Sequence, residues 1–508
     1  MLSHARPTLP RPLAVAALAV LVGAALAFPL TVRAQQHMPP ALSAIDTAML
    51  RRDMNFMASD AMRGREAGTL DELRASGWVA ERARDAGLVP AGDDGTYFQW
   101  WPMRRIQTSD RSTVALDGAP LALWKEVAVV TPVDARMTLP VTWVGDVSDD
   151  SVAKLDLKGR AVAAMIIPPG GTPLVPWISL RPWRYTGRAI GMRTQALLKA
   201  GAAAVLLVSD DSTDAQFIAV STPERRGIYT DDSVGAELPP RRPPVMWVPQ
   251  ALRARVMAAK ELTLDLHADS YVYPSVNVVA KVPGTDPKLR GEYVLFSGHQ
   301  DHDGVRWPMV PGDSIWNGAD DNASTSVAML AIGRAFVTHP APRTALFVWH
   351  GAEERGLLGS RWFAAHPTVP RDSIVAVLNG DMLGRNAPDS AALLGVQPPH
   401  RNSLALVDMA LDANARVGHF TLDSLWDRPT HPEGWYFRSD HLPYARVGIP
   451  AIFFTTLLHP DYHTPRDEAS RIDIPKLARV ARWIYATGWE VATAPQRPTV
   501  DPGFKLER

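Results

Sequence analysis

The sequence predicts an α/β fold, a three-layer sandwich in which a central mixed, largely parallel sheet is flanked by helices. From residue 275 onward, short apolar strands alternate with helical segments. This order is typical of sheets whose parallel strands are joined by crossover helices. In addition, 46% of the 508 residues are hydrophobic and 21% are charged. This composition is that of a globular chain with a large core.

The composition also excludes several kinds of site. The formal net charge is zero, so no basic field favours nucleic acid or an anionic membrane. The chain has no cysteine, which excludes disulfides, thiolate metal sites and cysteine nucleophiles. Any metal ion must therefore be held by histidines and carboxylates.

Residues 1–34 have the pattern of an export signal. A basic start precedes the apolar stretch 13–30, and small residues at 32–34 form a cleavage site before Gln35. The alternative is a retained anchor, because the apolar stretch is about long enough to span a bilayer. We expect cleavage, and hence a periplasmic or secreted chain without stable membrane insertion.

The remaining elements follow in order. Residues 43–104 are helical in pattern, with a second helix over 71–86 that ends at Gly87. Residues 106–265 carry short β-rich runs, proline turns and no cluster of metal ligands, which indicates an inserted domain, a spacer or lid without chemistry. The last part predicts strands over 276–282, 293–296, 343–349, 374–378 and 451–454, and helices over 325–336 and 474–494.

Acidic and histidine side chains follow the core strands. These are His299 and Asp301, then Glu353 and Glu354, then Asp381, then Asp461 and His463, with Asp320 and Asp321 just before the helix at 325. Sites in open α/β sheets lie at the carboxyl ends of strands, so these side chains should meet at one edge. A histidine and carboxylate set without thiolates suits zinc, with Mn²⁺ or Co²⁺ as alternatives. Adjacent residues point in different directions, so one of the two glutamates could be a metal ligand and the other a base.

These motifs resemble those of the co-catalytic zinc aminopeptidases, metallopeptidase family twenty-eight of clan MH, over residues 43–105 and 270–495. The resemblance implies two Zn²⁺ per chain and no other cofactor. The metal ligands it implies are His299 and Asp381 on one ion, Glu354 and His463 on the other, and Asp320 between them, with a cis peptide at Asp320–Asp321. The catalytic residues it implies are Glu353 as general base, Tyr462 as oxyanion donor and Asp301 as the residue that orients His299. Residues 106–269 resemble a protease-associated domain.

Family membership implies an exopeptidase acting on peptides, most often an aminopeptidase. One alternative is a carboxypeptidase or dipeptidase, in which Arg385 or Arg438 would hold the substrate carboxylate. The others are a glutaminyl-cyclase-like acyl transferase with one zinc ion and an inactive scaffold. The resemblance extends to Ser439-Asp440-His441, whose role the sequence leaves open, as it does the side-chain preference and the oligomeric state.

Overall fold

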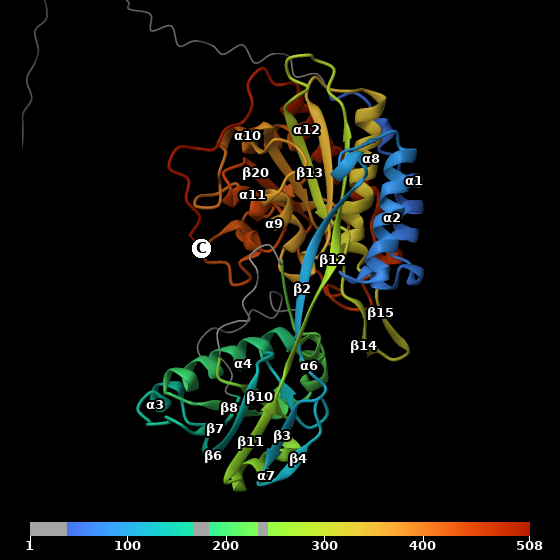
Figure 1. Ribbon diagram of the computed structural model, residues 1–508. Coiled ribbons are helices and arrows are strands. Elements are labelled where there is room, and N and C mark those ends of the chain that lie inside the picture. Colours follow the sequence, from blue (N-terminus) through green and yellow to red (C-terminus); the bar gives the residue numbers. More distant parts are fainter. Residues whose placement is uncertain (1–37, 167–181, 232–241, 508) are drawn as a thin grey trace, which may run out of the picture. The chain divides into compact units, whose positions relative to one another are not determined.

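The computed structural model describes residues 38–166, 182–231 and 242–507 (Figure 1). The predicted export signal, residues 1–34, lies outside these ranges. Residues 39–508 form one unit by their internal contacts. Within the described ranges, no helix combines the length and the apolar character needed to cross a membrane.

A ten-stranded mixed sheet carries the larger part of the fold. Its order is β19-β18-β20-β17-β13-β16-β12-β2-β9, with β1 beside β12. The central strands β16, β13, β17 and β20 run parallel, and β12, β2 and β9 on one side are antiparallel to their neighbours. On the other side, β18 is antiparallel to β20 and parallel to β19. The bounds are β1 (Val89–Pro90), β2 (Phe98–Thr108), β9 (Ile228–Asp231), β12 (Ala268–Val282), β13 (Tyr293–His299), β16 (Thr344–His350), β17 (Ile374–Gly380), β18 (Ser390–Leu394), β19 (Thr421–Leu422) and β20 (Ala451–Thr455).

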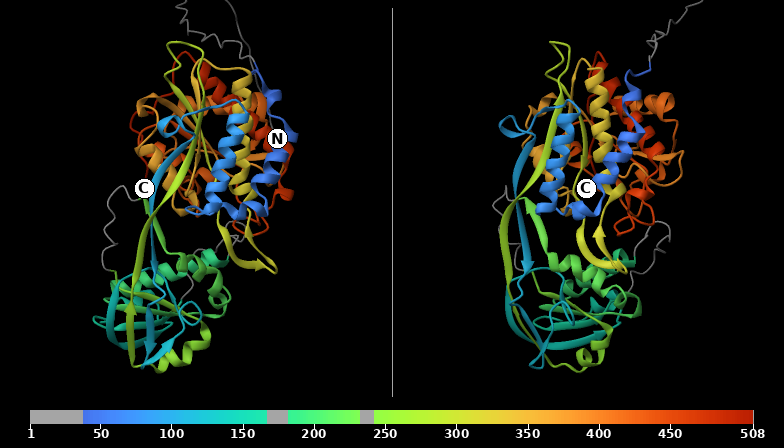
Figure 2. Two further views of the ribbon diagram at one scale, coloured as in Figure 1. Left: turned by 45° about the vertical axis from the view of Figure 1, so that its right-hand side comes forward. Right: turned by 90° about the vertical axis from the view of Figure 1, so that its right-hand side faces the viewer.

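Helices cover both faces of this sheet, which confirms the three-layer prediction (Figure 2). Successive strand residues alternate between faces. Phe296 of β13 packs into the cluster formed with α1 (Thr47–Met57), α2 (Leu70–Asp85), α8 (Ser324–Thr338), α10 (Leu404–Ala413) and α12 (Ile474–Thr493). Its neighbour Leu295 packs on the opposite face against α9 (Leu358–Ala365) and α11 (His441–Arg446).

Local sequence signals set the helix starts. The Thr69 hydroxyl accepts hydrogen bonds from the backbone N–H groups of Asp71 and Glu72 at the start of α2. The Asp473 side chain does the same for Lys476 at the start of α12, with a proline in the first turn. Both are N-cap residues that satisfy backbone donors left over by the helix.

The segment between β2 and β12 forms a second, eight-stranded sheet with its own hydrophobic clusters. Four of its strands, β6, β7, β8 and β10, are parallel, and α4 and α6 pack on one face. The strands are β3 (Thr113–Leu116), β4 (Ala119–Leu121), β5 (Ala128–Val129), β6 (Ala135–Gly145), β7 (Ala161–Met165), β8 (Ala204–Val208), β10 (Val245–Val248) and β11 (Glu261–Leu266). The helices are α3 (Asp149–Val152), α4 (Pro182–Lys199), α5 (Asp211–Asp214), α6 (Phe217–Arg226) and α7 (Arg253–Ala258).

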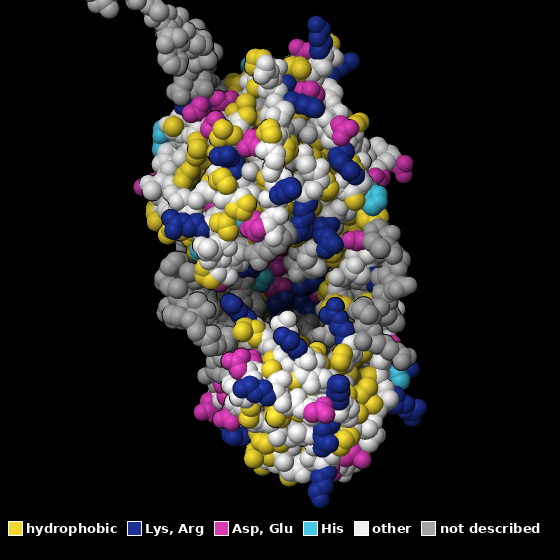
Figure 3. All heavy atoms as spheres, turned by 90° about the vertical axis from the view of Figure 1, so that its left-hand side faces the viewer, with side chains coloured by type: hydrophobic (Ala, Val, Ile, Leu, Met, Phe, Trp, Pro, Cys, Tyr) yellow, Lys and Arg dark blue, Asp and Glu magenta, His cyan; other side chains and the backbone are white. Residues whose placement is uncertain are grey.

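Strands β2 and β12 are neighbours in the ten-stranded sheet, and the chain enters the segment of the second sheet from β2 and leaves it into β12. They pair without interruption from Phe98 with Val278 to Thr108 with Ala268. The boundaries expected at 105/106 and 269/270 therefore fall inside continuous strands. The hairpin of β14 (Gly304–Val310) and β15 (Asp313–Trp316) follows β13. On the face drawn in Figure 3, basic and acidic side chains are interspersed.

Candidate metal centre

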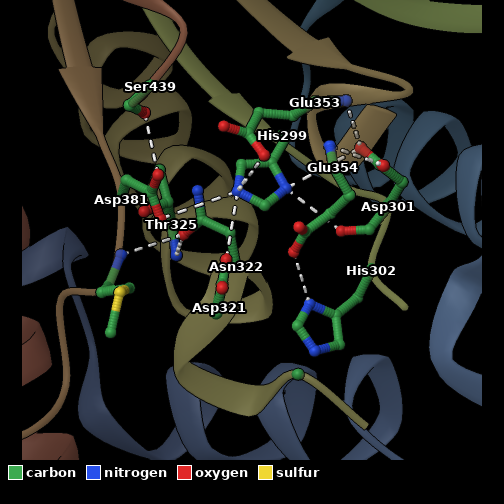
Figure 4. Close-up of polar contacts among 12 residues, drawn as sticks. His299, Asp301, His302, Asp321, Asn322, Thr325, Glu353, Glu354, Asp381 and Ser439 are labelled. Atoms are coloured by element: carbon green, nitrogen blue, oxygen red, sulfur yellow. Dashed lines mark hydrogen bonds and ion pairs between the residues drawn. The ribbon is translucent and has the colours of Figure 1, made fainter. Parts of the chain in front are cut away.

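The candidate side chains come from loops at the carboxyl ends of the parallel strands (Figure 4). His299 is the last residue of β13, and Asp381 directly follows β17. Glu353 and Glu354 open the turn η7 (Glu353–Arg355), three residues after β16. His463 comes from the segment after β20, and Asp321 from the irregular turn η6 (Ala319–Ala323) before α8. The predicted strand ends thus bring distant parts of the chain to one place.

Two groups of potential ligands share one carboxylate. His299, Asp321 and Asp381 form one group, and His302, Asp321, Glu354 and His463 form the other; within each group the donor atoms lie within 4.8 Å of one another. Asp321 Oδ1 is 3.2 Å from His299 Nε2, and Asp321 Oδ2 is 3.0 Å from His463 Nε2. One carboxylate therefore faces a histidine of each group.

The shared carboxylate is Asp321, which corrects the expectation for Asp320. Asp320 Oδ1 instead accepts a hydrogen bond from the Gly384 N–H at 2.6 Å, and its Oδ2 lies 3.4 Å from His459 Nε2. The cis peptide is Asp321–Asn322, one position later than expected. Asp467 fixes the turn by accepting from the backbone N–H groups of both aspartates, at 3.0 and 3.1 Å. Adjacent side chains point apart, and the sequence motif alone does not say which one faces the site.

Several buried nitrogen and oxygen atoms that could bind a metal lack a hydrogen-bond partner. They are His299 Nε2, His302 Nδ1, Glu354 Oε1 and Asp381 Oδ1. Unpaired buried polar atoms are costly, and an ion at their common focus would satisfy them. Since the donors are imidazoles and carboxylates, the residues fit divalent cations of the zinc, manganese or cobalt type.

Glu353 and Glu354 lie in different surroundings although they are neighbours. Burial raises the pKa of Glu353 well above its ordinary value, and nearby carboxylates add to this rise while His299 opposes it. Burial also acts to raise the pKa of Glu354, but His463 and His302 outweigh it and hold this pKa well below its ordinary value. The turn begins at Ala352 with φ 55° and continues through Gly356 with φ 105°, in the left-handed region that favours glycine.

Asp301 holds the glutamate turn. Its carboxylate accepts from the Glu353 N–H at 3.0 Å and from the Glu354 N–H at 3.3 Å. His299 Nδ1 is nearer to the Asp301 carbonyl, at 3.1 Å, than to its carboxylate, at 3.7 Å. Burial raises the Asp301 pKa to about 6, against the effect of His299. This residue contacts both His299 and the two glutamates.

Other side chains support the ligands. Ser439 donates to Asp381 Oδ2 at 2.8 Å, which gives this serine a structural role that the sequence left open. Its neighbour Asp440 is fully buried, and burial raises its pKa to about 7. The Tyr462 ring lies 4.0 Å from the His463 ring, and the Tyr462 hydroxyl accepts from Arg438 at 3.1 Å.

Comparison with known proteins shows that residues 277–488, which contain the candidate metal ligands, match the model of peptidase family M28. The chain carries a peptidase family M28 domain. This finding confirms the resemblance seen in the motifs.

Named relatives of the M28 domain are aminopeptidases. A probable leucine aminopeptidase of Trichophyton verrucosum (strain HKI 0517) is 26% identical over 258 residues, 49% of this chain and 66% of the relative. Aminopeptidase YwaD of Bacillus subtilis (strain 168) is 29% identical over 188 residues, 36% of this chain and 39% of the relative. The chain therefore spans less than two thirds of the length of these curated relatives.

Solved structures share the fold. The aminopeptidase from Aneurinibacillus sp. strain AM-1 has a TM-score of 0.56 at 19% identity, with 91% of this chain and 97% of that chain covered. BSAP, a zinc aminopeptidase from Bacillus subtilis, has a TM-score of 0.56 at 17% identity, with 92% and 100% covered.

Three residues that contact the candidate metal ligands or the turn that carries Asp321 were missed by the sequence analysis. His302 belongs to the second ligand group. Asp303 Oδ2 is 3.2 Å from His463 Nδ1, and Asp467 holds the aspartate turn. The signal for the first two was present, because they directly follow Asp301 in the chain. Asp467 had no such signal, since it lies in a loop four residues after His463.

Proposed function

We propose that this chain is an exported zinc-dependent exopeptidase, an aminopeptidase that holds two Zn²⁺ ions and removes N-terminal residues from peptides. The observation that carries the proposal is the Asp321 carboxylate, shared by two ligand groups, with Glu353 beside them. The zinc aminopeptidase fold and the leucine aminopeptidases among the relatives support it.

The bound ions would supply Lewis-acid activation of a water and of the scissile carbonyl. His299, Asp321 and Asp381 would hold one ion, and Asp321, Glu354 and His463 the other. Ser439 keeps the Asp381 carboxylate in place, and Asp303 does the same for the His463 ring.

Glu353 is the proposed general base. Its Oε2 lies 3.8 Å from His299 Nε2, and a carboxylate oxygen of Glu353 lies within 4.8 Å of ligand atoms of both His299 and Glu354. A carboxylate with a raised pKa is suited to take a proton from the attacking water and to return it to the leaving nitrogen. Asp301 fixes the backbone of this turn and so orients the base.

Tyr462 is the proposed oxyanion donor. Its hydroxyl oxygen accepts from the Arg438 guanidinium, and hydrogen bonds in such a chain polarise one another. The phenol would therefore be a stronger donor to the developing negative charge on the substrate.

An aminopeptidase is favoured over a carboxypeptidase by the surroundings of two arginines. Arg385 pairs with Asp461 at 2.6 Å, and Arg438 pairs with Glu433 at 2.9 Å. Both guanidiniums thus already have carboxylate partners. The remaining alternatives differ in measurable ways, since a cyclase of the glutaminyl type would need one ion per chain and a scaffold would show no turnover.

Metal dependence tests the proposal. Exhaustive chelation should abolish hydrolysis of aminoacyl-nitroanilides, and two equivalents of Zn²⁺ should restore it. N-blocked substrates should stay uncleaved throughout. Full activity in metal-free protein, or cleavage of N-blocked peptides alone, would refute the aminopeptidase. N-terminal sequencing of the exported protein should begin at Gln35.

A further inference from the structure

We propose that His302 is a metal ligand, so that the ion held by Glu354 and His463 has two imidazoles while the ion at His299 has one. The inference rests on the metal pair of the proposed function and adds a ligand to it. It makes the two sites chemically unequal.

The ring of His302 is fixed beside the second group. Its backbone N–H donates to the Arg65 carbonyl at 3.3 Å, and the residue forms a bridge with Glu66. The side chain is fully buried. It packs so closely on Gly318 that a Cβ there would lie 2.4 Å from the His302 Cγ. The ring therefore has little room to turn away.

The donor atoms are close but do not hydrogen-bond to each other. His302 Nδ1 is 2.9 Å from Glu354 Oε1, yet neither atom has a hydrogen-bond partner of acceptable geometry among the described residues. At this separation a hydrogen bond would be expected if the atoms pointed at one another. An ion that both atoms contact would satisfy both of them.

The spacing of the group matches one coordination sphere. Glu354 Oε1 is 3.3 Å from His463 Nε2, which is in turn 3.0 Å from Asp321 Oδ2. Ligand atoms around a tetrahedral zinc with bonds of about 2.0 Å lie roughly 3.3 Å apart. The rings of His302 and His463 are inclined by 82°, with centroids 5.3 Å apart, so they approach from different directions.

The consequence is a difference in metal preference. Imidazole-rich sites favour zinc and cobalt, whereas carboxylate-rich sites accept manganese. We therefore expect the site with His302 to retain Zn²⁺ during dialysis against a chelator, while the ion at His299 exchanges for Mn²⁺.

Proton NMR of the Co²⁺-substituted protein tests the ligand directly. Each imidazole bound to Co²⁺ gives one strongly shifted N–H resonance that disappears in D₂O. The wild type should show three, from His299, His302 and His463, and His302→Gln should show two. The control His459→Gln removes a buried histidine that faces Asp320 outside both groups, and should keep all three.

Zinc affinity separates a ligand from a residue that merely orients one. Loss of an orienting residue weakens metal binding about 10–100-fold. His302→Gln should weaken one of the two ions by more than about 100-fold. Two cobalt-shifted resonances in the wild type would overturn the inference even if the variant fails to fold. A protein that binds no pair of ions at all would instead refute the proposed function.

Discussion

At the scale of single residues, we expect the neighbouring carboxylates Glu353 and Glu354 to take different roles. Glutamine keeps the shape of Glu353 but accepts no proton, so Glu353→Gln should retain both zinc ions and lose turnover by about 10²–10⁴. Glu354→Gln should bind one ion more weakly and regain part of its activity at high zinc. Metal content per chain and kcat measured on both variants check this.

The opposite result would reverse the two assignments. If Glu353→Gln loses an ion while Glu354→Gln keeps both, Glu353 is the ligand. KM should change much less than kcat in Glu353→Gln, because the step that is lost is chemical.

A second residue-scale prediction concerns His400. Its Nδ1 lies 2.9 Å from Asp427 and its Nε2 2.8 Å from Glu507 near the C-terminus. Burial acts to lower its pKa, but the two carboxylates outweigh this and raise it. A histidine with a raised folded-state pKa stabilises the protein below its ordinary pKa of about 6.5, and this stabilisation is lost as the pH rises through the raised value.

Replacing His400 should therefore matter most at low pH. The Tm difference between wild type and His400→Gln should be larger at pH 6 than at pH 9, in zinc-containing buffer at both. His339→Gln, at an exposed position after α8, is the control and should show no such trend. An equal Tm difference at both pH values would contradict the ion pairs.

At the scale of elements, the sequence predicted the parallel centre of the sheet well. Strands such as β13 and β17 are continuous apolar runs followed at once by polar residues, and both signals are local. The long pairing of β2 with β12 was not predicted, because its strands are about 160 residues apart in the chain and nothing local marks them as partners. The choice of Asp321 over Asp320 was missed because it depends on the local backbone of this irregular turn, which the pair of adjacent aspartates in the sequence does not define.

The short element η2 (Asp60–Arg65) ends in a residue that joins two loops of the site. Arg65 is fully buried and donates to the carbonyls of Gln300, Asn317 and Gly318. Burial lowers its pKa to about 10. These carbonyls flank the turns that carry His302 and Asp321, so the arginine fixes the spacing between them.

Arg65→Met should consequently lower stability and zinc affinity together. Each buried carbonyl left without a donor costs about 1–3 kcal/mol, so we expect a total of at least about 3 kcal/mol. Arg63→Met is the matched control, since Arg63 is exposed and pairs with Asp71 at the surface. Thermal unfolding and zinc content measure both effects, and an unchanged Tm for Arg65→Met would refute the role.

At the scale of the whole molecule, the segment between β2 and β12 reaches the site through Arg226. This residue, the last of α6, donates to the carbonyls of Asp303 and Val305, each at 2.8 Å. The Asp303 carboxylate contacts His463. The segment expected to be a spacer without chemistry therefore supports a proposed metal ligand.

Arg226→Met should accordingly lower kcat/KM by about tenfold, or about 1.4 kcal/mol. Hydrogen bonds from a charged donor are worth about this much or slightly more. The neighbouring Arg225→Met, at an exposed position, should leave kcat/KM unchanged. If Arg226→Met and Arg225→Met have equal kcat/KM, the segment between β2 and β12 does not support the site through Arg226.

The hydrogen bonds of Asp301 to both glutamates have an evolutionary consequence. One carboxylate fixes the backbone that presents the proposed base and a proposed metal ligand, while its own carbonyl contacts His299. A substitution at this position would remove the acceptor of both glutamate N–H groups, so it would disturb the proposed base and a proposed metal ligand together. Selection that keeps the proposed chemistry would therefore also act to keep a hydrogen-bond acceptor at position 301.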